Sequence, residues 1–252
     1  MSRLFSLAGR RAIVTGANTG IGQGIAQSLA EAGAEVLAVG RSSMAETEAA
    51  IRAAGGKVTA IKADLGRTGT VAAMLDAAWD AHGPIDILVN NAGIIRRADA
   101  VDFSEADWDD VMDVNLKSVF LLCQALARRA LAAGRPAKIV NVASLLSFQG
   151  GIRVASYTAS KSGLAGLTKL LANEWAARGI NVNAIAPGYI ETNNTEALRN
   201  DPDRSSDILK RIPAGRWGRA EDIGGTAVYL ASDAANYVHG AILPVDGGWL
   251  GR

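Results

Sequence analysis

Short apolar runs alternate with longer alanine-rich segments along the whole chain, and this alternation constrains the fold more than any other feature. The short runs are rich in Val and Ile and are expected to be strands, at 11–15, 35–40, 57–64, 85–90, 137–144, 180–187 and 242–247. The longer segments have helical periodicity, at 21–33, 44–56, 69–83, about 104–133, 157–178 and about 220–230. Strands that are apolar throughout and separated by helices indicate a parallel sheet covered on both faces. The sequence therefore predicts an α/β fold with a doubly wound, seven-stranded sheet.

The composition is that of a globular protein. Of the 252 residues, 49% are hydrophobic and 20% are charged, and no linker or repeat divides the chain. We therefore expect residues 1–252 to form a single domain. The 26 basic and 25 acidic residues nearly cancel and form no basic block, so a nucleic-acid partner is not expected.

Several further features bear on compartment and partners. The single cysteine, Cys123, fits a reducing compartment. The start, MSRLFSLAGR, is too short and too weakly apolar for a signal peptide, and no apolar run approaches the ~20 residues that span a bilayer. A cytoplasmic location without a membrane partner is predicted. His82 and His239 have no second ligand at metal spacing, so no metal site is expected.

A glycine-rich turn follows the first expected strand and opens the first helix, with Gly16, Gly20 and Gly22 in a Gly-x3-Gly-x-Gly spacing. Glycines let a backbone approach a pyrophosphate closely, and a helix N-terminus offers free N–H groups and a positive dipole. The turn therefore favours a dinucleotide site. A glycine-rich turn without a ligand is the alternative.

The ends of the next strands bear on the form of the dinucleotide. Arg41, followed by Ser42 and Ser43, ends the second strand where a carboxylate would hold a ribose 2′-hydroxyl. Arginine there suits a 2′-phosphate and favours NADP. A solvated arginine at a strand end is the alternative. Asp64, after the third strand, either accepts from the adenine amino group or caps a helix.

Four residues suggest chemistry at the middle strands. Ser144 ends a strand, Tyr157 and Lys161 lie one helical turn apart on the same helix face, and Asn115 stands inside a long helix. A free tyrosine titrates near 10, and a lysine ammonium nearby favours its phenolate form. Tyr157 is the expected acid or base, Ser144 would orient the substrate oxygen, and Asn115 would anchor a water for proton exchange with Lys161. Packing, turn and capping roles are the alternatives for each residue taken alone.

With these motifs the sequence resembles the short-chain dehydrogenase/reductase family along essentially its whole length. The resemblance rests on TGANTGIG from Thr15, the segment Asn90–Gly93, Asn115, Ser144, Tyr157 with Lys161, and Pro187–Gly188. It implies a Rossmann sheet with strand order 3-2-1-4-5-6-7, a homotetramer and an NAD(P)-dependent oxidoreductase. It implies a proton relay that includes Asn115, and contacts of Lys161 with the nicotinamide ribose and of Ile190 and Thr192 with the carboxamide. The residues expected at the cofactor are Gly16, Asn18, Thr19, Gly20, Ile21, Gly22, Arg41, Asp64, Leu65, Asn91, Ala92, Gly93, Tyr157, Lys161, Pro187, Gly188, Ile190 and Thr192.

Longer strings, among them GIIRRADA, SLLSFQGGIRVASYTASKSG and VDGGWL, resemble family members that act on keto-sugar acids and are usually described as using NAD. A sugar-acid carboxylate calls for a cation, and Arg97 and Arg153 lie near the expected cleft, where a solvated or inter-subunit arginine is the alternative. Gln149 and Asn193 are expected to contact sugar hydroxyls. The polar stretch at about 188–219 is predicted to be a substrate-covering lid. A reductase of another carbonyl substrate and a non-catalytic cofactor-binding sensor are the competing functions.

Overall fold

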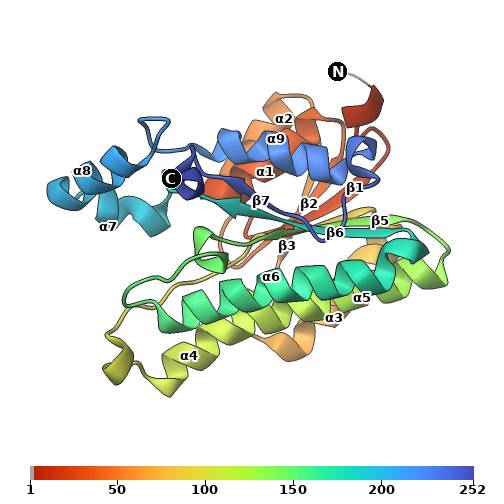
Figure 1. The fold of residues 1–252 in the computed structure, drawn as a ribbon. Coiled ribbons are helices and arrows are strands. Elements are labelled where there is room, and N and C mark those ends of the chain that lie inside the picture. Colours follow the sequence, from red (N-terminus) through yellow and green to blue (C-terminus); the bar gives the residue numbers. More distant parts are fainter. Residues whose placement is uncertain (1–2) are drawn as a thin grey trace.

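A single seven-stranded parallel sheet runs through the computed structural model, which describes residues 3–252 (Figure 1). The strand order is β3-β2-β1-β4-β5-β6-β7, as the resemblance predicted. The strands are β1 (Arg11–Thr15), β2 (Glu35–Gly40), β3 (Lys57–Lys62), β4 (Ile87–Asn90), β5 (Ala137–Val142), β6 (Ile180–Pro187) and β7 (Ile242–Val245). The doubly wound α/β fold is confirmed.

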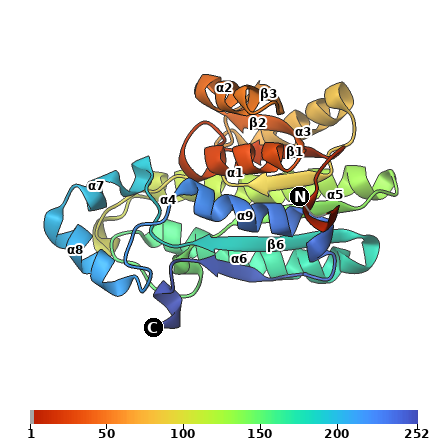
Figure 2. The same cartoon turned by 90° about the horizontal axis from the view of Figure 1, so that it is seen from above.

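Helices cover both faces of the sheet (Figures 1 and 2). On one face lie α1 (Gly20–Glu31), α2 (Ala45–Ala53) and α9 (Ala220–Ala231). On the other lie α3 (Thr68–His82), α4 (Glu105–Met112), α5 (Ser118–Ala132) and α6 (Ala155–Trp175). Successive residues of a strand point to opposite faces, so Val14 belongs to the core under α1 and α9 and Ile13 to the core over α3 and α5.

The long helix predicted at about 104–133 is a continuous helical run with one irregularity. Ser104 is its N-cap and accepts a hydrogen bond from the Asp107 N–H at 3.1 Å. Between α4 and α5 the segment Asp113–Lys117 takes a π-helical turn, and Asn115 lies inside it. Such turns are rare and occur often at functional sites.

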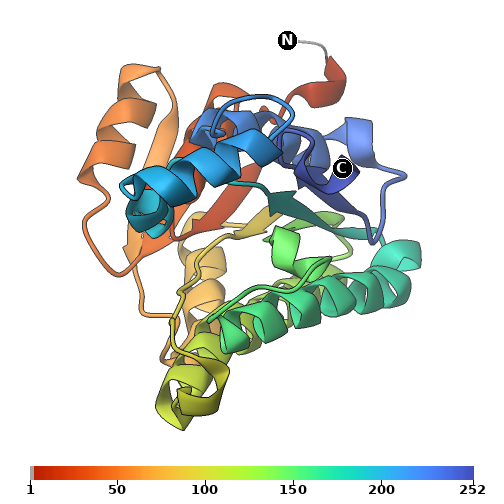
Figure 3. The ribbon, with the colours of Figure 1, turned by 60° about the vertical axis from the view of Figure 1, so that its left-hand side comes forward.

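The segment predicted as a lid contains helices that the sequence analysis did not anticipate. A 3-10 turn at Asn193–Thr195 leads into α7 (Glu196–Arg199), and α8 (Pro202–Arg211) follows. Figures 1 and 2 show α7 and α8 projecting beyond the body of the sheet, and in Figure 3 the same segment, in light blue, has come forward and lies in front of the sheet. Its two ends are joined, because Glu191 N–H donates to the Gly218 carbonyl at 2.8 Å and Gly218 N–H donates to the Tyr189 carbonyl at 2.9 Å.

Two kinds of feature are absent from residues 3–252. None of the helices there is long and apolar enough to cross a membrane. In the same residues, no group of three or more His, Cys, Asp or Glu side chains could hold a metal ion.

Candidate active site

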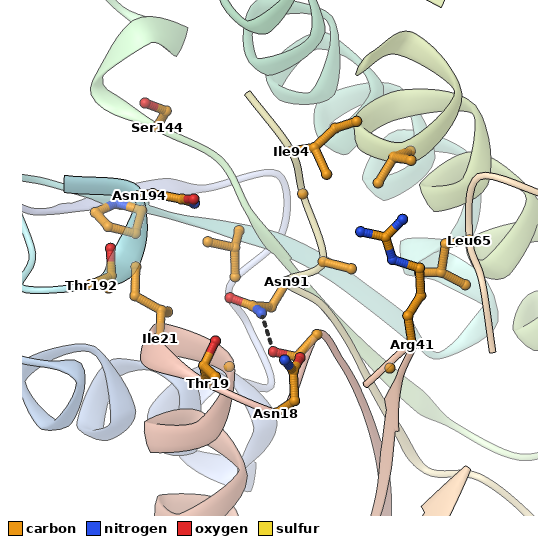
Figure 4. A pocket seen from close by; sticks show the side chains of 18 of the residues that line it. Asn18, Thr19, Ile21, Arg41, Leu65, Asn91, Ile94, Ser144, Thr192 and Asn194 are labelled. Carbon is orange, nitrogen blue, oxygen red and sulfur yellow. Dashed lines mark hydrogen bonds between the residues drawn. The ribbon is translucent and has the colours of Figure 1, made fainter. Parts of the chain in front are cut away.

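A cleft of about 420 Å³ lies at the carboxyl ends of the strands (Figure 4). It begins at the glycine-rich turn after β1, passes the ends of β2 and β3, and reaches the loops after β4, β5 and β6. Ligands of open α/β sheets bind at this edge, because the connections diverge there. The cleft therefore brings together the regions that the sequence analysis singled out.

The glycine-rich turn has the shape of a phosphate cradle. Gly16 and Gly20 have positive φ angles of 64° and 57°. A Cβ at Gly22 would lie 2.2 Å from the Gly16 carbonyl oxygen, so only glycine fits at position 22. Thr19, the N-cap of α1, makes no side-chain capping bond, so the N–H groups of the first turn have no side-chain acceptor. These residues fit the pyrophosphate of a dinucleotide.

The cradle is fastened to the end of β4. The Thr15 hydroxyl accepts hydrogen bonds from the N–H groups of Asn91 and Ala92, both at 3.0 Å. The Asn91 amide nitrogen donates to the Thr15 carbonyl at 2.9 Å and to the Gly16 carbonyl at 3.2 Å. Asn91 therefore shapes the turn as well as bordering the cleft. The sequence analysis placed Thr15 in the TGANTGIG motif but assigned it no role, because its partners Asn91 and Ala92 are distant in the sequence.

The ends of β2 and β3 form the far wall of the cleft. Arg41 is exposed, extends along this wall on the side where Leu65 lies, and forms no ion pair with another described residue (Figure 4). Ser42 accepts a hydrogen bond from the Asn18 amide at 2.9 Å, so the cradle and the end of β2 are in contact. Asp64 lines the cleft and its carboxylate also accepts from the Gly66 N–H at 3.1 Å, which holds the turn after β3.

Ser144, Tyr157 and Lys161 line the cleft together. Ser144 is the N-cap of the 3-10 turn Leu145–Ser147, which is why β5 ends earlier than predicted, at Val142. The Lys161 ammonium donates to the Val142 carbonyl at 2.6 Å and lies 5.6 Å from the centre of the Tyr157 ring. One helical turn of α6 therefore presents a phenol and a buried ammonium beside a serine hydroxyl.

Burial shifts the proton equilibria of both groups. Burial raises the pKa of Tyr157 above its usual value, and this outweighs the Ser144 hydroxyl and the Arg97 charge, which lower it. Burial lowers the pKa of Lys161 to about 8. The net shift of the Tyr157 pKa is opposite to the lowering expected from Lys161, because the ammonium is directed at the Val142 carbonyl and the phenol is desolvated.

Asn115 does not line the cleft but holds two of its walls together. Its side chain is fully buried; its amide oxygen accepts from the Ile94 N–H at 2.8 Å. Its amide nitrogen donates to the Ile94 carbonyl at 2.9 Å and to the Ser160 hydroxyl at 3.3 Å. The π-helical turn thus links the loop after β4 to the residue beside Lys161. The expected proton relay through Asn115 stays a prediction.

The predicted cofactor residues come together, with one exception. Gly20 does not line the cleft, although its positive φ helps to form the turn. The cleft also includes residues that carry no motif. Near the strand ends these are Ala63, Gly66, Ile94, Val142 and Ala143, which the rule that ligands bind beyond strand ends could have found. Val114 of the π-helical turn and Thr195 of the predicted lid line the cleft as well, and no sequence signal pointed to them.

The predicted substrate residues other than Ser144 and Tyr157 do not line the cleft. Gln149 accepts a hydrogen bond from the Trp249 indole at 3.2 Å, and Arg153 is exposed and paired with Asp99 at 3.1 Å. Asn193 is exposed, whereas its neighbours Asn194 and Thr195 line the cleft.

Arg97 is also exposed and outside the cleft lining, but its contacts differ from those of Arg153. It donates to the Asn194 carbonyl at 3.3 Å, pairs with no carboxylate among the described residues, and has a charge that reaches Tyr157.

Comparison with known proteins assigns the class. A family model described as enoyl-(acyl carrier protein) reductase matches residues 16–250, and the chain belongs to the short-chain dehydrogenase/reductase family. It is an oxidoreductase.

Relatives and solved structures match almost from end to end. The chain is 56% identical to a 2-dehydro-3-deoxy-D-gluconate 5-dehydrogenase of Escherichia coli over 98% of both chains. It is 57% identical to a protein of the same name from Bacillus subtilis, over 98% of this chain and 97% of the other. A structure from Agrobacterium tumefaciens with bound NADP, provisionally assigned as a 2-deoxy-D-gluconate 3-dehydrogenase, is 65% identical with a TM-score of 0.95 over 100% of both chains.

Proposed function

We propose that this enzyme transfers a hydride between a nicotinamide dinucleotide and a secondary alcohol or ketone of a sugar acid, with 2-dehydro-3-deoxy-D-gluconate or 2-deoxy-D-gluconate as substrate. The single observation that carries the acidic substrate is Arg97, a cation that donates to the Asn194 carbonyl beside the cleft and pairs with no carboxylate in residues 3–252. The names of the relatives from E. coli and B. subtilis support the same substrate class.

The dinucleotide supplies the hydride acceptor or donor. Tyr157 exchanges a proton with the substrate oxygen, because its phenol lies in the cleft beside the Ser144 hydroxyl. Ser144 holds that oxygen in place. Lys161 anchors the end of β5 to α6 through the Val142 carbonyl and presents a cation 5.6 Å from the Tyr157 ring. Asn115 holds α6 and the loop after β4 together through its hydrogen bonds to Ile94 and Ser160.

Arg97 is the residue we assign to the substrate carboxylate. Arg153 is paired with Asp99, and Arg96 is paired with Asp107 and Asp110 at 3.1 and 3.2 Å. Arg97 has only the neutral Asn194 carbonyl as a partner, and a carboxylate is a stronger acceptor for a guanidinium than a carbonyl. Its contact with Asn194 lies on the predicted lid. A substrate carboxylate at Arg97 would therefore lie between the lid and Tyr157.

We further propose that the cofactor is NADP. Arg41 and Ser42 line the wall where a ribose 2′-phosphate would lie, and no carboxylate stands at the end of β2. Bound NADP in the A. tumefaciens structure and in a gluconate 5-dehydrogenase structure from Burkholderia cenocepacia (40% identity, TM-score 0.93, over 99% and 98% of the chains) supports this choice. The relatives' names do not state a cofactor.

The assembly and the compartment are also proposals. We propose a homotetramer in the cytoplasm. An apolar groove on α5 and α6 supports the assembly, since Phe120 and Leu170 expose 36% and 51% of their surface beside Leu116 and Leu167. A molar mass by light scattering of about four times the 26.1 kDa chain is the expected result.

Initial-rate kinetics test the function. We expect oxidation of sugar acids with NADP, and kcat/KM for NADP above that for NAD by at least about tenfold. A 3-oxoacyl thioester is the comparison substrate, because the chain is also 41% identical to a 3-oxoacyl-[acyl-carrier-protein] reductase from Vibrio cholerae. Faster turnover of the thioester than of every sugar acid would overturn the proposal. A preference for NAD would overturn only the assignment of Arg41 to the 2′-phosphate and would leave the proposed reaction standing.

A further inference from the structure

A small apolar cluster lies apart from the two cores that cover the sheet. Its buried members are Leu145, Ile208, Ile212, Trp217 and Trp249. They come from three separate segments. Leu145 lies in the turn after Ser144, Ile208, Ile212 and Trp217 lie in the predicted lid, and Trp249 lies near the C-terminus. The turn after Ser144 and the start of the predicted lid border the end of the cleft away from the phosphate cradle, because Ser144, Asn194 and Thr195 line the cleft there. The cluster joins these two segments to each other and to the C-terminal residues.

Trp249 is the member that contacts all three segments. Its ring centre lies 4.7 Å from that of Tyr189, the residue after Pro187–Gly188, and 4.0 Å from the Arg211 guanidinium at the end of α8. Its indole N–H donates to the Gln149 side chain at 3.2 Å, in the loop that follows Ser144. Only 4% of Trp249 is exposed, and it does not line the cleft.

The turn that carries Trp249 is itself fixed. The Asp246 carboxylate accepts from the Gly248 N–H at 2.8 Å and from the Leu250 N–H at 2.9 Å. A Cβ at Gly188 would lie 2.6 Å from the Cα of Asp246, so the turn lies directly against a residue of the cleft wall. Arg252 adds a bond to the Lys210 carbonyl of α8 at 3.1 Å. The segment Asp246–Arg252 is therefore a rigid support and not a loose end.

We propose that Trp249 is a positioning residue that holds the lid and the Ser144 loop at a fixed separation, and thereby sets the fit of the substrate. The inference rests on the proposed function only for the identity of that substrate. Trp249 suits the role because a rigid ring and a directional N–H act together: the ring fixes Tyr189 and Arg211, and the N–H fixes Gln149. No residue of the phosphate cradle belongs to this cluster and no member of the cluster lines the cleft, so we assign it no part in binding the cofactor.

Two substitutions separate the ring from the hydrogen bond. Trp249→Phe keeps an aromatic ring beside Tyr189 and removes the N–H donor, and Trp249→Ala removes both. We expect KM for the sugar acid to rise about threefold in the first variant and about tenfold or more in the second. The dissociation constant of NADP, measured by titration, should stay within about twofold of that of the unmodified protein, because the cradle lies elsewhere.

Trp79 supplies the matched control. It is half-buried on α3, where it packs against the core on the other face of the sheet. Trp79→Phe and Trp79→Ala make the same chemical changes away from the cleft. They should lower the melting temperature without raising KM for the sugar acid. If KM for the sugar acid rose equally in the Trp79 and Trp249 variants, the cause would be a general loss of stability, and the proposal would be overturned.

A second measurement does not need a substrate. The lid carries exposed trypsin sites at Arg204 and Lys210, and a loosened lid would be cut faster. We expect the native Trp249→Ala protein to be cleaved there at least about fivefold faster than the native Trp79→Ala protein. Equal cleavage rates, with KM unchanged, would overturn the inference. If the unmodified protein fails to turn over any sugar acid, the proposed function fails, and the cleavage rates still decide the role of Trp249.

Discussion

The two ends of the cleft, here called the cofactor half and the substrate half, depend on different parts of the chain. The cofactor half consists of backbone: glycines that only glycine can replace, the N-terminus of α1, and strand ends fastened by Thr15 and Asn91. The proposed substrate half depends on side chains from segments far apart in the sequence: Ser144 and Tyr157 line it, and Arg97 and Trp249 contact the predicted lid from outside the cleft lining. Backbone cradles bind any dinucleotide, whereas side chains on loops select among substrates. Substitutions in the two halves should therefore separate into losses of cofactor binding and losses of substrate binding.

The largest effect is expected at Tyr157, where the two halves meet. Tyr157→Phe removes the proton-exchanging group and leaves the ring, so kcat should fall at least about 10³-fold. The dissociation constant of NADP should stay within about twofold of its original value, because no contact with the phosphate cradle is lost. Steady-state kinetics and a binding titration check both statements.

The pH profile adds a readout for the same variant. Since the pKa of Tyr157 is raised, the phenolate fraction grows with pH across the neutral range, and kcat for alcohol oxidation should rise with pH. Tyr157→Phe should remove that rise. A variant that keeps a tenth of the original kcat with the same pH profile would show that another group exchanges the proton.

The next largest effect tests the backbone cradle. In Gly22→Ala the new Cβ would lie 2.2 Å from the Gly16 carbonyl, so the turn must shift. We expect the dissociation constant of NADP to rise at least about thirtyfold and the free energy of unfolding to fall by about 1–3 kcal/mol. Calorimetric titration and urea unfolding measure the two.

Gly225→Ala in α9 is the control for that change, because a Cβ at Gly225 meets nothing within 4 Å. It should leave NADP binding unchanged and stabilise the helix by about 0.5–1 kcal/mol. Unimpaired NADP binding in Gly22→Ala would contradict the picture of a rigid backbone cradle.

The same division explains what the sequence predicted. The doubly wound sheet and the cradle were predictable because they follow from apolar periodicity and from glycine spacing, which are local signals, whereas the strand order was implied by the family resemblance. Gln149 and Arg153 were expected at the substrate, but their side chains are engaged by Trp249 and Asp99, which only the folded chain brings near. Helix α8 was missed because Ile208 is its only buried residue, although Asp201 followed by Pro202 is a helix start signal that could have revealed it.

A smaller effect, confined to the substrate half, is expected at Arg97. Arg97→Ala should raise KM for the sugar acid about tenfold to thirtyfold, because the carboxylate loses its cation, and should leave the dissociation constant of NADP unchanged. Arg153→Ala is the matched control and should change KM less than about threefold, since its guanidinium is exposed and paired with Asp99. Kinetics of both variants on the same sugar acid decide between them. If Arg153→Ala has the larger effect, the assignment of the carboxylate is wrong.

The smallest effect is expected at Arg41, an exposed side chain of the cofactor half. Arg41 lies at the rim of the cleft in contact with solvent, so its attraction for a 2′-phosphate is screened. Arg41→Ala should weaken NADP binding about threefold to tenfold and leave NAD binding unchanged. The ratio of the NADP dissociation constants of the variant and the unmodified protein should approach unity as salt is raised. Titrations with both cofactors at low and high salt measure this. An equal loss of affinity for NADP and NAD would mean that Arg41 contacts a part of the dinucleotide that both forms share. The backbone alone would then not account for the binding of that shared part.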